Sequence, residues 1–180
     1  MRIAVIGWGS LVWDPGNLDV ETEWRADGPM LAVEFGRFSS RERLTLVLEG
    51  GAPPQRTLWT LSRKETLAAA VADLRVREGT TRANIGFWGV GNAGAYQAGV
   101  VAEIHRWATE LELDGAVWTA LGPNNLGQES GLATSDARVS YLKKLVASGK
   151  ESAAREYVEK APRQVDTPLR RRIRDELGWR

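Results

Sequence analysis

The sequence of 180 residues contains no cysteine and one histidine, His105. Without cysteine, disulfide bonds, thiolate metal sites and cysteine nucleophiles are all excluded. One histidine is too few for a histidine-rich metal site, so we expect no bound metal. His105 lies between charged neighbours in a helical pattern and is expected to face solvent without a catalytic role. Acid–base chemistry must therefore come from carboxylates or tyrosines.

An excess of charge of one sign is also missing. The chain has 24 lysines and arginines, 23 aspartates and glutamates and a net charge of +1, so no strong field attracts nucleic acid and we expect no such partner. No stretch has membrane-spanning length and no signal-peptide pattern is found, which predicts a cytoplasmic protein without membrane association. The length favours a single domain, 1–180.

Apolar runs bounded by turn residues predict a strand-rich first third and a helical end. Strands are expected at 2–6, 30–35, 43–49, 56–61, 84–90 and 115–121. Helices are expected at 62–78, 97–111, 135–147, 151–160 and 168–177. Ser62 and Glu65 match a capping box for the first helix, and Thr167 is a cap for the last. The arginines at 170–174 are interpreted as a solvated helix face.

The first strand runs into a glycine-rich segment, Gly7-Trp8-Gly9-Ser10-Leu11. A dinucleotide fingerprint needs a third glycine where this sequence has Val12. The residues WDPG at 13–16 are typical of a turn, whereas the fingerprint requires a helix to begin there. A nucleotide-dependent enzyme is therefore a minor hypothesis. Residues 9–11 can instead present backbone N–H groups, with the Ser10 hydroxyl, to a small anion such as a carboxylate. The alternative is a tight turn whose glycines serve backbone geometry alone.

A carboxylate interrupts the apolar face of the helix at 62–78. Leu67, Val71 and Leu74 follow helical spacing, and the next position on that face is Glu78. Both burial and the negative end of the helix dipole disfavour a charged carboxylate there, which makes Glu78 a candidate general base. The alternative is a glutamate that turns to solvent or forms an ion pair with Arg75, Arg77 or Arg82.

Two short motifs together resemble the γ-glutamylcyclotransferase family. Trp8-Gly9-Ser10-Leu11 is similar to the family's Tyr-Gly-Ser-(Asn/Leu) turn. Leu74-Arg-Val-Arg-Glu78-Gly79 is similar to the Leu-x-x-x-Glu-Gly context of its catalytic glutamate. TLWTLS at 57–62 resembles a V-W-x-(L/M) strand of the family, and the order of elements resembles it over most of the chain.

The resemblance implies an α+β fold with a small mixed β-barrel flanked by helices, and a reaction without cofactors. In that reaction the α-amine of a γ-glutamyl group attacks its own γ-carbonyl, which gives 5-oxoproline and releases an amine. Glu78 would be the acid–base residue, and Trp8, Gly9, Ser10 and Leu11 would bind the γ-glutamyl substrate. Tryptophans on the surface can pack a homodimer or cap a core, so the oligomeric state stays open.

The chain departs from the family pattern at three places. Trp8 replaces the tyrosine of the turn and so removes a hydroxyl. Ile85 stands where many relatives have a tyrosine about seven residues after the glutamate. The helix at 97–111 looks like an insertion. A second hypothesis is therefore a catalytically silent small-molecule binding or interaction module on the same fold.

Overall fold

The computed structural model describes residues 1–39, 42–93, 98–124 and 134–180. Their contacts divide the chain into two compact units, each made from two separate stretches of sequence. Unit 1 comprises Met1–Leu31 and Arg56–Leu121, and unit 2 comprises Ala32–Gln55 and Gly122–Arg180. Both contain helices and strands, so the expected α+β class is confirmed. The single domain 1–180 stays a prediction.

Every predicted strand and helix is present, although most of them begin or end a few residues away from the predicted position. The strands are β1 (Ile3–Gly7), β2 (Met30–Phe38), β3 (Leu44–Leu48), β4 (Pro54–Arg56), β5 (Leu58–Leu61), β6 (Ile85–Gly89), β7 (Asn92–Ala93) and β8 (Gly115–Thr119). The helices are α1 (Leu67–Glu78), α2 (Ala98–Glu110), α3 (Ser135–Ala147), α4 (Ser152–Lys160) and α5 (Pro168–Leu177), with a 3₁₀ turn at Arg82–Asn84. The short strands β4 and β7 were not predicted.

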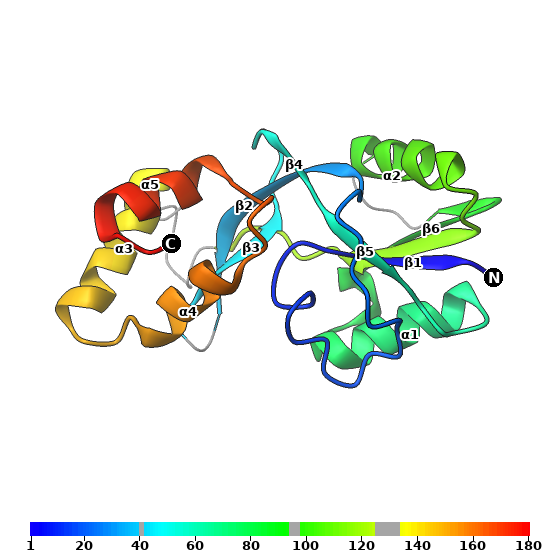
Figure 1. Ribbon diagram of the computed structural model, residues 1–180, viewed down its shortest axis with the longest axis horizontal. Helices are drawn as coiled ribbons and strands as arrows, with labels where there is room; N and C mark the ends of the chain where they lie inside the picture. Colours follow the sequence, from blue (N-terminus) through cyan, green and yellow to red (C-terminus); the bar gives the residue numbers. More distant parts are fainter. Residues whose placement is uncertain (40–41, 94–97, 125–133) are drawn as a thin grey trace. The chain divides into compact units, whose positions relative to one another are not determined.

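Unit 1 is built on a five-stranded sheet in the order β5-β1-β8-β6-β7. β1 and β8 are parallel, whereas β5 and β6 are antiparallel to their neighbours. Helices α1 and α2 cover opposite faces of this sheet (Figure 1). Because side chains alternate along a strand, Val5 and Val117 face α1, where they share a core with Leu74. On the other face, Trp107 of α2 meets the Trp59 ring edge-on at 5.3 Å between centroids.

Gly86 is required by the tight packing of β6 against β8. A Cβ atom at Gly86 would lie 2.2 Å from Cε2 and Nε1 of Trp118, a side chain with no exposed surface. Gly86→Ala is therefore expected to lower the free energy of unfolding by about 2–3 kcal/mol, because neither the strand nor the indole can move freely. Denaturant unfolding measures this.

Gly99→Ala in α2 is the matched control, because a Cβ there meets no atom within 4 Å. Alanine is the better helix former, so this variant should gain up to about 1 kcal/mol. Equal effects of the two substitutions would contradict the packing assigned to Gly86.

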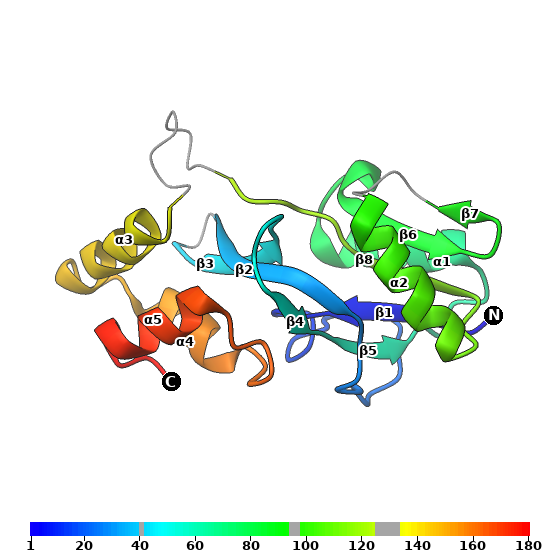
Figure 2. The same cartoon turned by 90° about the horizontal axis from the view of Figure 1, so that it is seen from above.

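Unit 2 contains most of a three-stranded sheet in the order β3-β2-β4. A register shift between Phe35 and Arg37 interrupts the antiparallel pairing of β2 with β3. Helices α3, α4 and α5 lie next to one another beside these strands (Figure 2). The Tyr157 ring of α4 packs edge-on against Phe35 at 6.3 Å, and its hydroxyl accepts the Leu46 N–H at 3.3 Å.

One expectation stays untested and another is wrong. The described strands form two sheets and no closed barrel is found among them, so the small β-barrel stays a prediction. The capping box at Ser62 and Glu65 is wrong: α1 begins at Leu67, and the Thr66 hydroxyl accepts the Ala69 N–H at 3.2 Å. Ser62 instead forms a β-bridge with Val20, which extends the strand region past β5.

None of the described helices has the length and apolar character needed to cross a bilayer.

The solvated face expected for the arginines of α5 is wrong at its first member. Arg170 is 8% exposed, and its guanidinium donates to four backbone carbonyls. These belong to Val158, Ala161, Pro162 and Val165, at 2.6–3.2 Å. The side chain therefore satisfies the carbonyls at and after the end of α4, which the spacing of charges along α5 could not indicate.

Unit 2 also buries a carboxylate, Glu34, which accepts the N–H groups of Phe35 at 2.8 Å and Leu169 at 3.2 Å. Burial raises the pKa of Glu34 above its ordinary value of 4.5, although hydrogen bonds from Thr167 and these N–H groups oppose the shift. The folded state therefore holds this proton more tightly than the unfolded chain. Protonated Glu34 therefore stabilises the folded state below about pH 4.5, and this stabilisation is lost as pH rises through the raised pKa of Glu34.

We expect the native protein to lose unfolding free energy over this window relative to Glu34→Gln, by at most about 1.4 kcal/mol per pH unit. Urea unfolding of both proteins at several pH values measures the difference. Parallel pH profiles for the two proteins would contradict a raised pKa at Glu34.

Candidate functional site

The segment after β1 folds into a turn that its own backbone closes. The Val12 N–H donates to the Gly9 carbonyl at 3.0 Å, and the Asp14 N–H donates to the Ser10 carbonyl at 2.8 Å. Residues 10–13 are turn residues, so no helix begins here. A dinucleotide-binding fold places a helix N-terminus at this position. The geometry therefore agrees with the minor weight that the sequence gives to a dinucleotide-binding fold.

The four predicted substrate-binding residues lie in this turn but differ in exposure. Trp8 and Leu11 are each 5% exposed, and Leu11 shares the core with Val71 and Leu74 of α1. Ser10 is half-buried. Trp8 and Leu11 thus hold the turn in place, while the Ser10 side chain and the backbone are what the turn can present to a ligand.

The turn retains donors that can bind an anion. Within the described residues, the backbone N–H groups of Gly9, Ser10 and Leu11 have no hydrogen-bond partner. Successive N–H groups in a turn suit a carboxylate or a developing oxyanion. These donors are consistent with a small-anion turn, and the hydrogen bonds that close the turn are equally consistent with the alternative, a turn whose glycines serve backbone geometry alone.

Glu78 is the last residue of α1, because Gly79 takes the left-handed conformation with φ 58° and ends the helix. Val71 and Leu74 on the same face are buried, and the Glu78 side chain is 14% exposed. The helical spacing therefore predicted its position correctly. A carboxylate does lie at the end of the packed face of α1.

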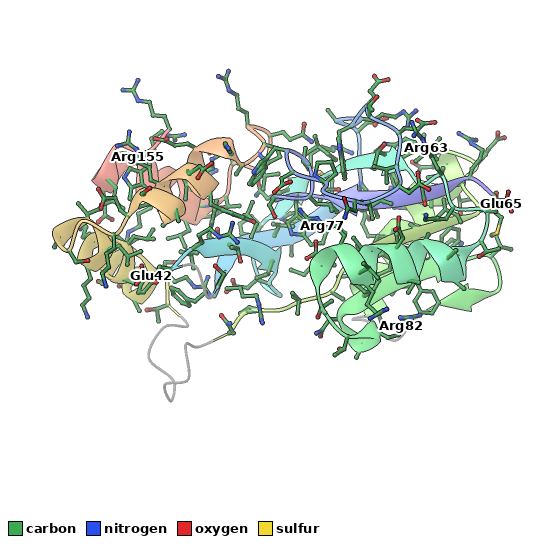
Figure 3. All side chains as sticks on the ribbon, turned by 90° about the horizontal axis from the view of Figure 1, so that it is seen from below. Glu42, Arg63, Glu65, Arg77, Arg82 and Arg155 are labelled. Atoms are coloured by element: carbon green, nitrogen blue, oxygen red, sulfur yellow. The ribbon has the colours of Figure 1, made fainter. Side chains whose placement is uncertain are left out.

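Arg77 connects Glu78 to the turn. Its guanidinium donates through Nη1 to Oε1 of Glu78 and through Nη2 to the Asp14 carbonyl. Figure 3 shows Arg77 between the end of α1 and the segment that follows β1. Because the Asp14 N–H is itself bonded to the Ser10 carbonyl, a short chain of contacts links the glutamate to the predicted substrate turn.

This ion pair has two interpretations. It orients the Glu78 carboxylate beside the turn, as a base would need to be oriented. It is also the structural salt bridge that the sequence left open as the alternative for Glu78. No group of three or more histidines, aspartates or glutamates in the described ranges is placed to hold a metal ion.

Sequence reasoning did not assign two parts of the site. The Asp14 backbone carbonyl acts as an acceptor for Arg77, and the Trp24 ring lies against Gly7, where a Cβ would come within 2.8 Å of Cζ3. Irregular segments such as 8–29 have no periodicity from which such contacts can be predicted. Ile85, which stands where many members of the resembled family have a tyrosine, is a buried residue of β6.

Comparisons of the chain with protein-family models, with curated proteins and with solved structures found no match.

Proposed function

We propose that this protein is a γ-glutamylcyclotransferase-like enzyme that releases 5-oxoproline from a γ-glutamyl amide. Glu78 takes a proton from the α-ammonium group of the substrate, and the freed amine attacks the γ-carbonyl carbon. The new C–N bond closes the five-membered ring and the bond to the leaving amine breaks. Glu78 returns the first proton to that amine, and the proton that the ring nitrogen then loses also passes to it, so that it leaves as an ammonium ion. The turn of Trp8, Gly9, Ser10 and Leu11 binds the α-carboxylate or the oxyanion through its N–H groups.

One observation carries the proposal. A mostly buried carboxylate at the end of α1 is connected, through a single guanidinium, to a turn in which the N–H groups of Gly9, Ser10 and Leu11 have no hydrogen-bond partner among the described residues. Two motifs that lie almost seventy residues apart in the sequence are therefore joined in unit 1 by a direct chain of contacts. Such a pairing of a base with anion-binding donors suits an intramolecular acyl transfer.

The family resemblance adds a small mixed β-barrel flanked by helices and a reaction without cofactors. A cytoplasmic location and a possible homodimer are further parts of the proposal that do not come from this resemblance.

A second candidate is a catalytically silent binding or interaction module that uses the same turn. The observation that favours it is the ion pair itself, because Arg77 already occupies one oxygen of Glu78. Such a module would bind a γ-glutamyl compound through the turn and release no product.

The test is 5-oxoproline release by the full chain from a panel of γ-glutamyl dipeptides and γ-glutamyl amines. The matched α-glutamyl dipeptides serve as controls, because their α-amine cannot expel the attached residue by this ring closure. Release from γ-glutamyl compounds alone supports the enzyme. Silence across the panel contradicts it, and a thermal shift with the same compounds would then favour the binding module.

A further inference from the structure

An open groove lies at the opposite end of the unit 1 sheet from the turn. β1 runs from Ile3 to Gly7 and Ile3 pairs with Gly115 at the start of β8, whereas the turn follows Gly7. The groove has a volume of about 680 Å³, which is within the range of small-molecule sites. Its lining includes Trp88, His105, Glu112 and Asp114.

One wall of this groove is a pair of stacked aromatic rings. The imidazole of His105 on α2 lies over the indole of Trp88 on β6, with 4.9 Å between centroids and 26° between planes. Trp88 is 7% exposed, while His105 is exposed. The prediction that His105 faces solvent is thus confirmed, and its ring also extends the aromatic surface outward. Flat or cationic groups bind such surfaces favourably.

The other wall carries two carboxylates. Asp114 is fixed, because its Oδ2 accepts the Arg2 backbone N–H at 2.6 Å and its own N–H donates to the Arg2 carbonyl at 2.9 Å. Glu112 follows the end of α2, and the Arg2 guanidinium holds this loop by donating to the carbonyls of Leu111 and Glu112, each at 3.2 Å. Within the described residues the Glu112 carboxylate has no hydrogen-bond or ion-pair partner.

The charges around the groove determine which ligand fits. Among the residues that the structure describes, no lysine or arginine lines it. The Arg2 guanidinium is held by backbone carbonyls, and Arg106 on α2 is paired with Glu103 at 2.6 Å and Glu110 at 3.7 Å. Among the described residues the lining therefore holds two carboxylates beside an aromatic wall, and the Arg2 guanidinium contacts backbone carbonyls rather than either carboxylate, so a cation is favoured over an anion.

We propose that this groove binds a small organic cation, with its ammonium group at Glu112 and Asp114 and its flat or apolar body on the Trp88–His105 stack. The site is separate from the turn and does not depend on the proposed enzymatic activity. Its ligand carries a positive charge and an apolar group within one small molecule, because charge pairing and stacking act at adjacent walls.

His105 is the only histidine of the chain, so its ring gives an unambiguous signal from this groove. The full chain with isotope-labelled histidine is titrated at constant pH with benzylamine, benzyl alcohol and benzoate, and the ring resonances are followed by NMR. We expect saturable shifts with benzylamine, weaker shifts with benzyl alcohol and almost none with benzoate. Added salt should weaken the benzylamine response, because the charge pairs are exposed. Equal shifts with all three compounds, or none at millimolar concentration, would overturn the proposal.

Two variants test whether the carboxylates of Glu112 and Asp114 bind the positive charge of the ligand. Glu112→Gln and Asp114→Asn should each weaken benzylamine binding about two- to fivefold. Asparagine keeps the oxygen that accepts the Arg2 N–H, and if Asp114→Asn fails to fold, the exposed position of Glu112 keeps the test available. Glu110→Gln is the control, because this exposed carboxylate lies outside the groove lining. An unchanged affinity in Glu112→Gln, or an equal loss in Glu110→Gln, would refute a cation site at this wall.

Discussion

Replacement of Glu78 by glutamine is expected to lower 5-oxoproline release by about 10²–10⁴-fold, the usual range for loss of general acid–base catalysis. Glutamine keeps the size of the side chain and an oxygen that can accept from Arg77, so the contacts at the end of α1 are retained. It cannot take the proton of the substrate ammonium. The loss should therefore fall mainly on kcat, while KM changes little. Steady-state assays with the best compound of the panel measure this.

Glu65→Gln is the matched control, because Glu65 is exposed and lies just before α1 at the position labelled in Figure 3. Its activity should equal that of the native protein. Circular dichroism of both variants separates loss of chemistry from loss of fold. Full activity in Glu78→Gln would show that Glu78 is not the base and that its ion pair with Arg77 has a structural role.

Arg170→Ala is expected to lower the free energy of unfolding by about 3–5 kcal/mol. The buried guanidinium is the shared donor for four carbonyls in the segment from α4 to Val165. Alanine leaves these acceptors without that donor and creates a void beside them. Denaturant unfolding followed by circular dichroism measures the loss, and the change should appear as a lower midpoint.

Arg171→Ala tests whether the loss of stability comes from the buried position of Arg170 or from the removal of any positive charge from α5. Arg171 is exposed, and its Nη1 donates to the carbonyl of Asp166 at 2.6 Å, so its loss should be below about 1 kcal/mol. If Arg170→Ala does not fold, Arg170→Lys gives the measurement, because an ammonium group cannot reach all four carbonyls and should cause an intermediate loss. Similar values for positions 170 and 171 would contradict the role assigned to Arg170.

The order of helices and strands could be predicted from the sequence because it depends on local signals. Glycine, proline and serine clusters bound the strands, and apolar residues at helical spacing mark the helices. The start of α1 was placed too early, since Ser62 resembles a cap but pairs with Val20. Caps and β-bridges use the same small polar residues, and only a distant strand partner distinguishes them.

The positions of the candidate site residues could be predicted from the sequence, but the contact that joins them could not. The spacing of Val71, Leu74 and Glu78 placed the carboxylate on the packed face of α1, and Val12 argued against a nucleotide cradle. The contact of Arg77 with Asp14 was not predictable. A long flexible side chain next to Glu78 can reach several partners, and the sequence does not show which carbonyl lies within its range.

The sequence by itself determined the α+β class, the turn after β1, and the places of Glu78 and Thr167 at the ends of their helices. These features depend on the backbone preferences and apolar spacing of neighbouring residues. Tertiary structure alone decided that Arg170 is buried, that Arg77 joins Glu78 to the turn, and that His105 stacks on Trp88 beside two carboxylates. Arg77 meets a carbonyl 63 residues away, whereas Arg170 meets carbonyls 5–12 residues before it, across the turn between α4 and α5. Each contact needs separate elements to fold against one another, and the free energy that favours it comes from the packing and desolvation of the partners together.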